Sequence, residues 1–129
     1  MGLMDSLFGK STQSSDFPWV ALQNEAQIAE LELESQTSLV VVFKHSTRCG
    51  ISRSVLNRFE RAYDHSLQGI TFYYLDILAH RSISNALAER YEVWHESPQL
   101  LAIRNATVVS HSSHYDIEAA NLQALIPTR

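Results

Sequence analysis

The chain contains a single cysteine, Cys49, among its 129 residues. A lone cysteine excludes an intramolecular disulfide. It also excludes a dithiol reductase or isomerase acting alone, because no second thiol of the chain can resolve a mixed disulfide. Free thiols persist in reducing compartments, so we expect a cytoplasmic location.

The chain also lacks long apolar runs and a large excess of either charge. Its longest apolar run, residues 39–43, is far shorter than the roughly 18 residues that span a bilayer. Residues 1–8 lack the basic and apolar regions of a secretory signal. The net charge of −4 argues against a nucleic-acid binder that relies on overall charge. We therefore expect neither a membrane nor a nucleic acid as a partner.

Segments of extended and helical character alternate along the chain. Runs rich in β-branched and aromatic residues indicate strands over residues 17–20, 39–43, 70–77, 99–103 and 107–111. Apolar residues at helical spacing indicate helices over residues 22–34, from residue 50 to a stop at Gln68-Gly69, and over residues 82–91 and 117–125. This order predicts an α/β fold with a mostly parallel central sheet, helices on both faces and a terminal antiparallel hairpin.

The length suits one domain with a core of its own. Residues 1–15 are small and polar, so we expect a flexible N-terminal leader followed by a single domain over residues 16–129. The hairpin between the last two strands carries Asn105-Ala106 where Asn-Gly is common. Alanine at positive φ costs about 1 kcal/mol, which leaves the turn type open.

Cys49 lies between the most apolar strand and a helix. In open α/β sheets, chemistry occurs beyond the carboxyl ends of the strands. A thiol must be ionised to attack a disulfide, and a helix start stabilises an anion by about 0.3–1 kcal/mol. Residues 35–59 include no acidic residue and four basic ones, Lys44, Arg48, Arg53 and Arg58. We therefore expect a reactive Cys49 in positive surroundings that attract anionic low-molecular-weight thiols.

Two neighbours of Cys49 have both an ordinary and a chemical interpretation. Ser52 sits where the helix begins, and its hydroxyl can donate a hydrogen bond to a thiolate but cannot resolve a disulfide. His45 is either a local cation and proton donor or a solvated loop histidine. The residues expected to support Cys49 are His45, Thr47, Arg48, Gly50, Ser52 and Arg53.

Other assignments for these side chains are weaker. A lone cysteine can be a small buried apolar residue. Cys49 could join His95, His111 and His114 in a metal site, but no pair among them has the short spacing of a zinc site, so we expect no metal. Pro98 precedes a strand, and its peptide bond with Ser97 is either an ordinary trans bond or a cis bond facing the cysteine.

Four segments carry a resemblance to a known family. They are residues 43–52 (Phe-Lys-His-Ser-Thr-Arg-Cys-Gly-Ile-Ser), 56–60 (Leu-Asn-Arg-Phe-Glu), 83–85 (Ile-Ser-Asn) and 95–100 (His-Glu-Ser-Pro-Gln-Leu). Together they resemble the YtxJ family of monothiol bacilliredoxins, which belong to the bacillithiol redox system of some bacteria. The similarity extends from about Trp19 to Ile117.

The resemblance implies a thioredoxin fold with Cys49 as the nucleophile and Ser97-Pro98 as the cis-proline loop that binds substrate. It further implies that Cys49 takes bacillithiol from protein mixed disulfides and is then regenerated by a second thiol or a dedicated reductase. The implied partners are thiolated client proteins and the small thiol, which acts as co-substrate, with no bound cofactor.

Two alternatives remain open at this point. Cys49-Gly50-Ile51-Ser52 differs at one position from the Cys-Gly-Phe-Ser of monothiol glutaredoxins, which share a [2Fe–2S] cluster between two subunits. The chain could instead be a thioredoxin-like docking module with an inert cysteine.

Overall fold

A five-stranded mixed sheet forms the centre of the protein, in the order β1-β3-β2-β4-β5. The strands are β1 (Trp19–Ala21), β2 (Val40–His45), β3 (Thr71–Asp76), β4 (Gln99–Arg104) and β5 (Thr107–Ser113). Strands β1, β3 and β2 run parallel to one another, whereas β4 is antiparallel to β2 and β5 is antiparallel to β4. This computed structural model describes residues 17–126, so the leader expected over residues 1–15 lies outside the described residues.

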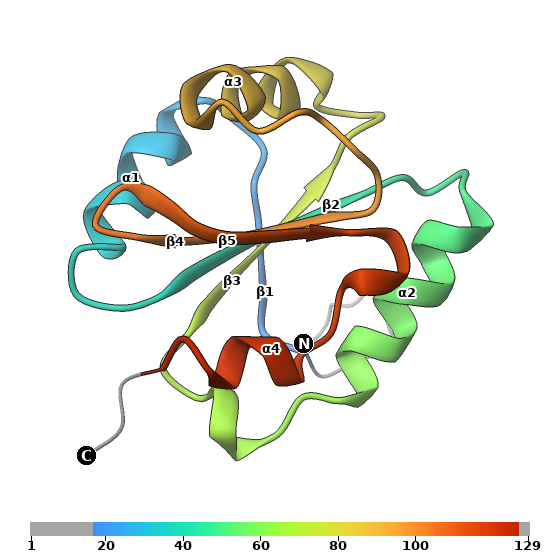
Figure 1. Cartoon of the computed structure of the whole chain (residues 1–129). Coiled ribbons are helices and arrows are strands. Elements are labelled where there is room, and N and C mark those ends of the chain that lie inside the picture. The colour runs from blue at the N-terminus through green and yellow to red at the C-terminus, as the bar shows by residue number, and fades with distance from the viewer. Residues whose placement is uncertain (1–16, 127–129) are drawn as a thin grey trace, which may run out of the picture.

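Helices cover both faces of this sheet. They are α1 (Ala26–Glu34), α2 (Gly50–Arg61), α3 (Arg81–Tyr91) and the short α4 (Ala120–Gln123), with 3₁₀ turns at His65–Leu67 and His114–Asp116. Figure 1 shows α1 and α3 on one face and α2 and α4 on the other. The predicted α/β fold, with parallel central strands and a terminal antiparallel hairpin, is confirmed.

Alternation along β2 divides the core into two layers. Val40 and Val42 pack with α1 and α3, whereas Val41 and Phe43 pack with α2 and α4. All six residues of β2 are buried, because this strand has neighbours on both sides and helices on both faces. The same alternation directs Lys44 to the α3 face and His45 to the α2 face.

Several predicted boundaries were wrong, each for a local reason. His45 belongs to β2 rather than to a loop, since its carbonyl accepts from Ile77 N beside β3. Helix α1 starts at Ala26 instead of residue 22, because Leu22 N still bonds Tyr74 O beside the sheet.

The C-terminal ends of two predicted helices also differ. Helix α2 stops at Arg61, well before Gln68-Gly69, and Asp64 starts a separate 3₁₀ turn by accepting from Ser66 N at 2.9 Å. The closing helix predicted over residues 117–125 shortens to Ala120–Gln123, because Ile117 has an extended backbone with ψ 117° and the chain leaves the helix in a tighter turn from Leu125 N to Leu122 O.

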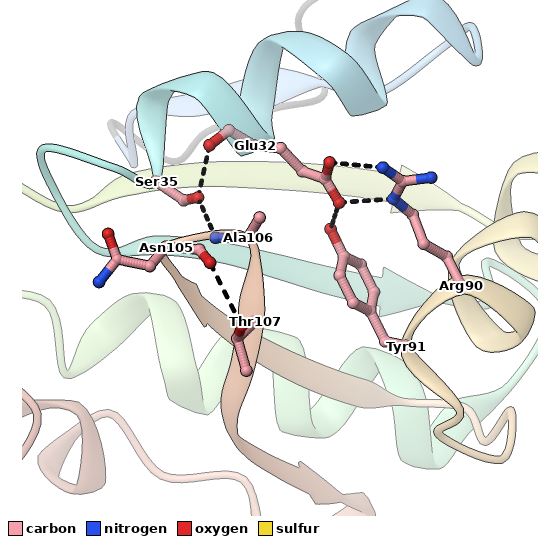
Figure 2. Close-up of polar contacts among 7 residues, drawn as sticks. All are labelled: Glu32, Ser35, Arg90, Tyr91, Asn105, Ala106 and Thr107. Atoms are coloured by element: carbon pink, nitrogen blue, oxygen red, sulfur yellow. Dashed lines mark hydrogen bonds and ion pairs between the residues drawn. The ribbon is translucent and has the colours of Figure 1, made fainter.

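The β4–β5 hairpin turns at Asn105 and Ala106, whose φ angles are 53° and 57°. A type I′ turn requires positive φ at both central residues, so the hairpin has this turn type and Ala106 adopts the unfavourable positive φ. Figure 2 shows how the end of α1 holds this turn. Ser35 Oγ accepts from Ala106 N at 2.9 Å, and Ser35 O accepts from Asn105 N at 2.8 Å.

Replacing Ala106 by glycine should stabilise the fold by about 0.5–1 kcal/mol. Glycine adopts positive φ without the Cβ clash, and this gain exceeds the extra entropy of the unfolded chain. The bond to Ser35 is retained because its donor is the backbone. The measurement is urea unfolding. Ala88→Gly in α3 is the control, and it should destabilise by about 1 kcal/mol; an equal loss in both variants would contradict the prediction.

A second contact in Figure 2 joins the two helices of the same face. The Glu32 carboxylate of α1 accepts hydrogen bonds from Arg90 and Tyr91 at the end of α3. The hydrogen bond from the Arg90 guanidinium holds the pKa of the Glu32 carboxyl below its ordinary value. This end of α3 is therefore tied to α1.

Candidate active site

Cys49 is the N-cap residue of α2 and is partly exposed, with a free thiol. Its carbonyl accepts the first helical hydrogen bond, from Arg53 N at 3.0 Å, and its own N–H donates to Ser46 O at 3.2 Å. The backbone around the sulfur is thus fixed, and the sulfur makes no capping bond to the helix. A thiol held in this way is open to an incoming reactant.

The predicted neighbours Ser52 and His45 contact each other under the Cys49 loop. Ser52 is fully buried, and its Oγ lies 2.7 Å from His45 Nδ1. The same Oγ accepts from Ser46 N at 3.1 Å. The hydroxyl therefore links β2, the loop and α2, instead of bonding the sulfur of Cys49.

His45 is almost entirely buried, in contrast to the solvated loop histidine that the sequence allowed. Burial lowers the pKa of its imidazole; the Asp76 carboxylate opposes that change and the Arg53 guanidinium adds to it. His45 is therefore predominantly neutral at pH 7. A neutral imidazole can accept a hydrogen bond from the Ser52 hydroxyl. His45 therefore fits a structural role better than the role of a local cation.

Ser52→Ala should lower the free energy of unfolding by about 1–3 kcal/mol, since it leaves Ser46 N and His45 Nδ1 without their buried partner. The measurement is urea unfolding. The matched control is Ser54→Ala, an exposed serine on the same helix, which should stay within about 0.5 kcal/mol of the wild type. Equal stability of the two variants would show that the Ser52 link is dispensable.

The four basic residues near Cys49 in sequence do not gather around it. Lys44 points to the opposite face of the sheet, where its Nζ donates to Ser84 O at 3.3 Å. Arg58 donates to the carbonyls of Tyr115 and Ile117. Of the four basic residues that were expected to surround the thiol, two therefore remain near it.

Arg48 and Arg53 are the two that stay with the Cys49 loop. Arg48 is adjacent to the cysteine and exposed. Arg53 donates to Thr47 O at 2.7 Å, which lays its guanidinium along the loop. Thr47 and Gly50 are exposed on either side of the thiol. The six residues expected to support Cys49 thus lie at the end of β2, in the loop, or in the first turn of α2.

The Ser97–Pro98 peptide bond is cis, as the resemblance implied. Lys44 pairs with Gln99 across the β2–β4 ladder, so Pro98 lies at the carboxyl end of β2. The loop that leads to Cys49 leaves β2 at the same end. The cysteine and the proline therefore lie at the same end of the sheet.

A polar cluster beneath the α3–β4 loop was not foreseen from the sequence. Ser84 Oγ of α3 lies 3.0 Å from His95 Nδ1, and Gln99 Nε2 donates to Trp94 O at 2.8 Å. In the sequence, Ser84 lies in one of the segments that carry the resemblance and falls within the apolar spacing of Ile83 and Leu87, but neither signal gives it a partner. The partner of that serine could not be foreseen, because His95 lies outside the helix.

Within residues 17–126, no three histidine, cysteine or acidic side chains come together as a metal site. In the same part of the chain, no helix has both the length and the apolar character needed to cross a bilayer.

The arrangement of strands and helices matches solved structures of thioredoxins. The chain aligns with Fasciola hepatica thioredoxin at TM-score 0.61 and 20% identity, covering 81% of this chain and 93% of that one. It aligns with oxidised thioredoxin O2 of Arabidopsis thaliana at TM-score 0.63 and 16% identity, covering 84% and 90%. Another structure with a thioredoxin fold matches at TM-score 0.71 and 28% identity, covering 83% and 92%. The protein therefore has the thioredoxin fold, here with a single thiol at the first turn of α2.

Residues 20–122 match the family described as monothiol bacilliredoxin BrxC. The match spans most of the chain and includes both Cys49 and the Ser97-Pro98 loop. The chain belongs to the monothiol bacilliredoxin family, and with its thioredoxin fold it is a thiol oxidoreductase.

Proposed function

We propose that the protein removes bacillithiol, or a similar low-molecular-weight thiol, from protein mixed disulfides through Cys49. The observation that carries the proposal is the partly exposed thiol at the first turn of α2, with no second cysteine in the chain. An enzyme of this composition can accept a small thiol but must pass it on to an external reductant.

The exchange proceeds in two balanced steps. The Cys49 thiolate attacks the small-thiol sulfur of the mixed disulfide. A disulfide forms between Cys49 and the small thiol as the bond to the client sulfur breaks, and the client leaves as a thiolate that takes a proton from solvent. A second small thiol or a dedicated reductase then attacks the Cys49 mixed disulfide, and the released Cys49 thiolate completes the cycle. The oxidising equivalent passes to the external reductant.

The surroundings of Cys49 suit an anionic small thiol. Arg48 is exposed next to the cysteine, and Arg53 lies along the preceding loop. Positive charge at the entrance raises the local concentration of an anion. On the other side, the Ser97-Pro98 loop at the same end of the sheet is where an extended client segment would pair.

Mass spectrometry tests this proposal directly. The reduced protein is mixed with a reporter protein that carries bacillithiol on its one cysteine, and the intact mass of both proteins is followed. The expected result is the transfer of one bacillithiol mass to the peptide that contains Cys49, with release of the free reporter. Failure of any adduct to form, or an adduct elsewhere in the chain, would contradict it.

A second assay addresses the iron–sulfur alternative. The protein is reconstituted anaerobically with iron, sulfide and the small thiol, and its visible spectrum and oligomeric state are measured. A colourless monomer is the result expected for a thiol transferase. A coloured dimer would instead support a cluster carrier.

A further inference from the structure

The α3–β4 loop carries Ser97-Pro98 toward the thiol, yet apolar packing contributes little to its position. Among residues 92–98, only Val93 and Pro98 are buried as whole residues, and Trp94 is 90% exposed. Ser97 Oγ is buried and has no hydrogen-bond partner within the described part of the chain. The position of the loop therefore depends on a small number of polar contacts.

Two of these contacts come from beneath the loop. The Ser84 hydroxyl of α3 lies 3.0 Å from His95 Nδ1, and Gln99 Nε2 donates to Trp94 O. A third contact is the more exposed pair of Glu96 and His114, at 3.3 Å. Exposed ion pairs contribute little, so the Ser84–His95 bond is the main side-chain link between the loop and a helix.

Ser84 is itself held in place from the sheet. It is fully buried, and its carbonyl accepts from Lys44 Nζ, which reaches it from β2 at 3.3 Å. Because β2 leads directly into the Cys49 loop, one chain of contacts runs from β2 through α3 to His95. The two halves of the candidate site thus share a common rigid support.

We propose that Ser84 and His95 are positioning residues that hold the Ser97-Pro98 loop for pairing with the client segment next to Cys49. This inference rests on the proposed function. Neither side chain reacts with the disulfide. Loss of their contact should weaken client binding and leave the intrinsic reactivity of the thiol intact.

The test compares two amides at one position. In His95→Asn the side-chain amide can occupy the place of Nδ1 and keep the bond to Ser84, whereas in His95→Gln it extends to the place of Nε2 and loses that bond. Ser84→Ala removes the partner hydroxyl but keeps the carbonyl that Lys44 bonds. Ser82→Ala, an exposed serine on the same helix, is the control.

For the bacillithiolated reporter, we expect Ser84→Ala and His95→Gln to raise KM about five- to tenfold with little change in kcat, the loss typical of one hydrogen bond. His95→Asn and Ser82→Ala should stay within about twofold of the wild type. Alkylation of Cys49 by iodoacetamide should proceed at equal rates in all of them. Equal impairment of the two amide variants, or a matching fall in alkylation rate, would overturn the inference.

Amide hydrogen exchange of residues 93–97 provides a readout that needs no thiol substrate. Exchange should rise about fivefold in Ser84→Ala and His95→Gln, and not in His95→Asn. Unchanged exchange in all variants would refute the positioning role, even if the wild type transferred no bacillithiol. Absence of transfer by the wild type alone would count against the proposed function and not against the loop contact.

Discussion

Replacing Cys49 by alanine should abolish thiol transfer, lowering the rate by at least about a thousandfold, to the uncatalysed background. No other group of the chain can take over, because Cys49 is the only cysteine. Ser52, at the position that a second cysteine occupies in a dithiol motif, is buried and bonded to His45. The measurement is the release of free thiol from the bacillithiolated reporter.

The fold should tolerate this replacement. Cys49 is partly exposed and its structural contacts are made by its backbone, so the free energy of unfolding should change by less than about 1 kcal/mol. Circular dichroism and urea unfolding check that condition. Transfer by a folded Cys49→Ala protein at a rate near that of the wild type would remove the thiol mechanism altogether.

Lys44→Met should stabilise the protein by about 1–3 kcal/mol at pH 7. The Lys44 side chain is fully buried, and its ammonium has one hydrogen bond, to Ser84 O, and no carboxylate partner among residues 17–126. Removing a cation from water without a counterion is costly, and an apolar side chain of similar volume avoids that cost. Chemical unfolding of the two proteins measures the difference.

The same substitution should also change how the free energy of unfolding depends on pH. Burial lowers the pKa of Lys44 from 10.5 to about 8, so above pH 8 the unfolded chain binds more protons than the folded one. The free energy of unfolding should therefore rise between pH 8 and pH 10 in the wild type, and this rise should be absent in Lys44→Met. Arg48→Met is the control, since Arg48 is exposed, and it should keep the wild-type slope. A loss of stability in Lys44→Met would contradict the prediction, because it would mean that the hydrogen bond to Ser84 O contributes more free energy than burial of the ammonium costs.

The general architecture could be predicted because its signals are local. The apolar run at residues 39–43 and the turn-spaced apolar residues after Gly50 depend on the nearest neighbours in sequence. They placed Cys49 at a strand-to-helix junction without reference to the rest of the chain. The errors fall at element ends, such as the start of α1 and the stop of α2, where single tertiary contacts compete with weak local preferences.

The surroundings of the thiol were less predictable. Proximity in sequence placed Lys44 and Arg58 beside Cys49, but a strand sends alternate side chains to opposite faces, and a helix turns its residues away within one turn. Lys44 therefore contacts α3, and Arg58 reaches the backbone near Ile117. Such partners are far apart in sequence, and no local pattern identifies them.

By itself, the sequence determined the order of strands and helices and the presence of one thiol where a helix begins, because these properties reside in short segments. Only the tertiary structure decided that Ser52 bonds His45 under the loop, and that Ser84 supports the loop through His95. Those contacts form because folding places the C-terminal end of β2, the helix α3 and the start of β4 next to one another. Their strength depends on burial, which belongs to the whole fold and not to any segment.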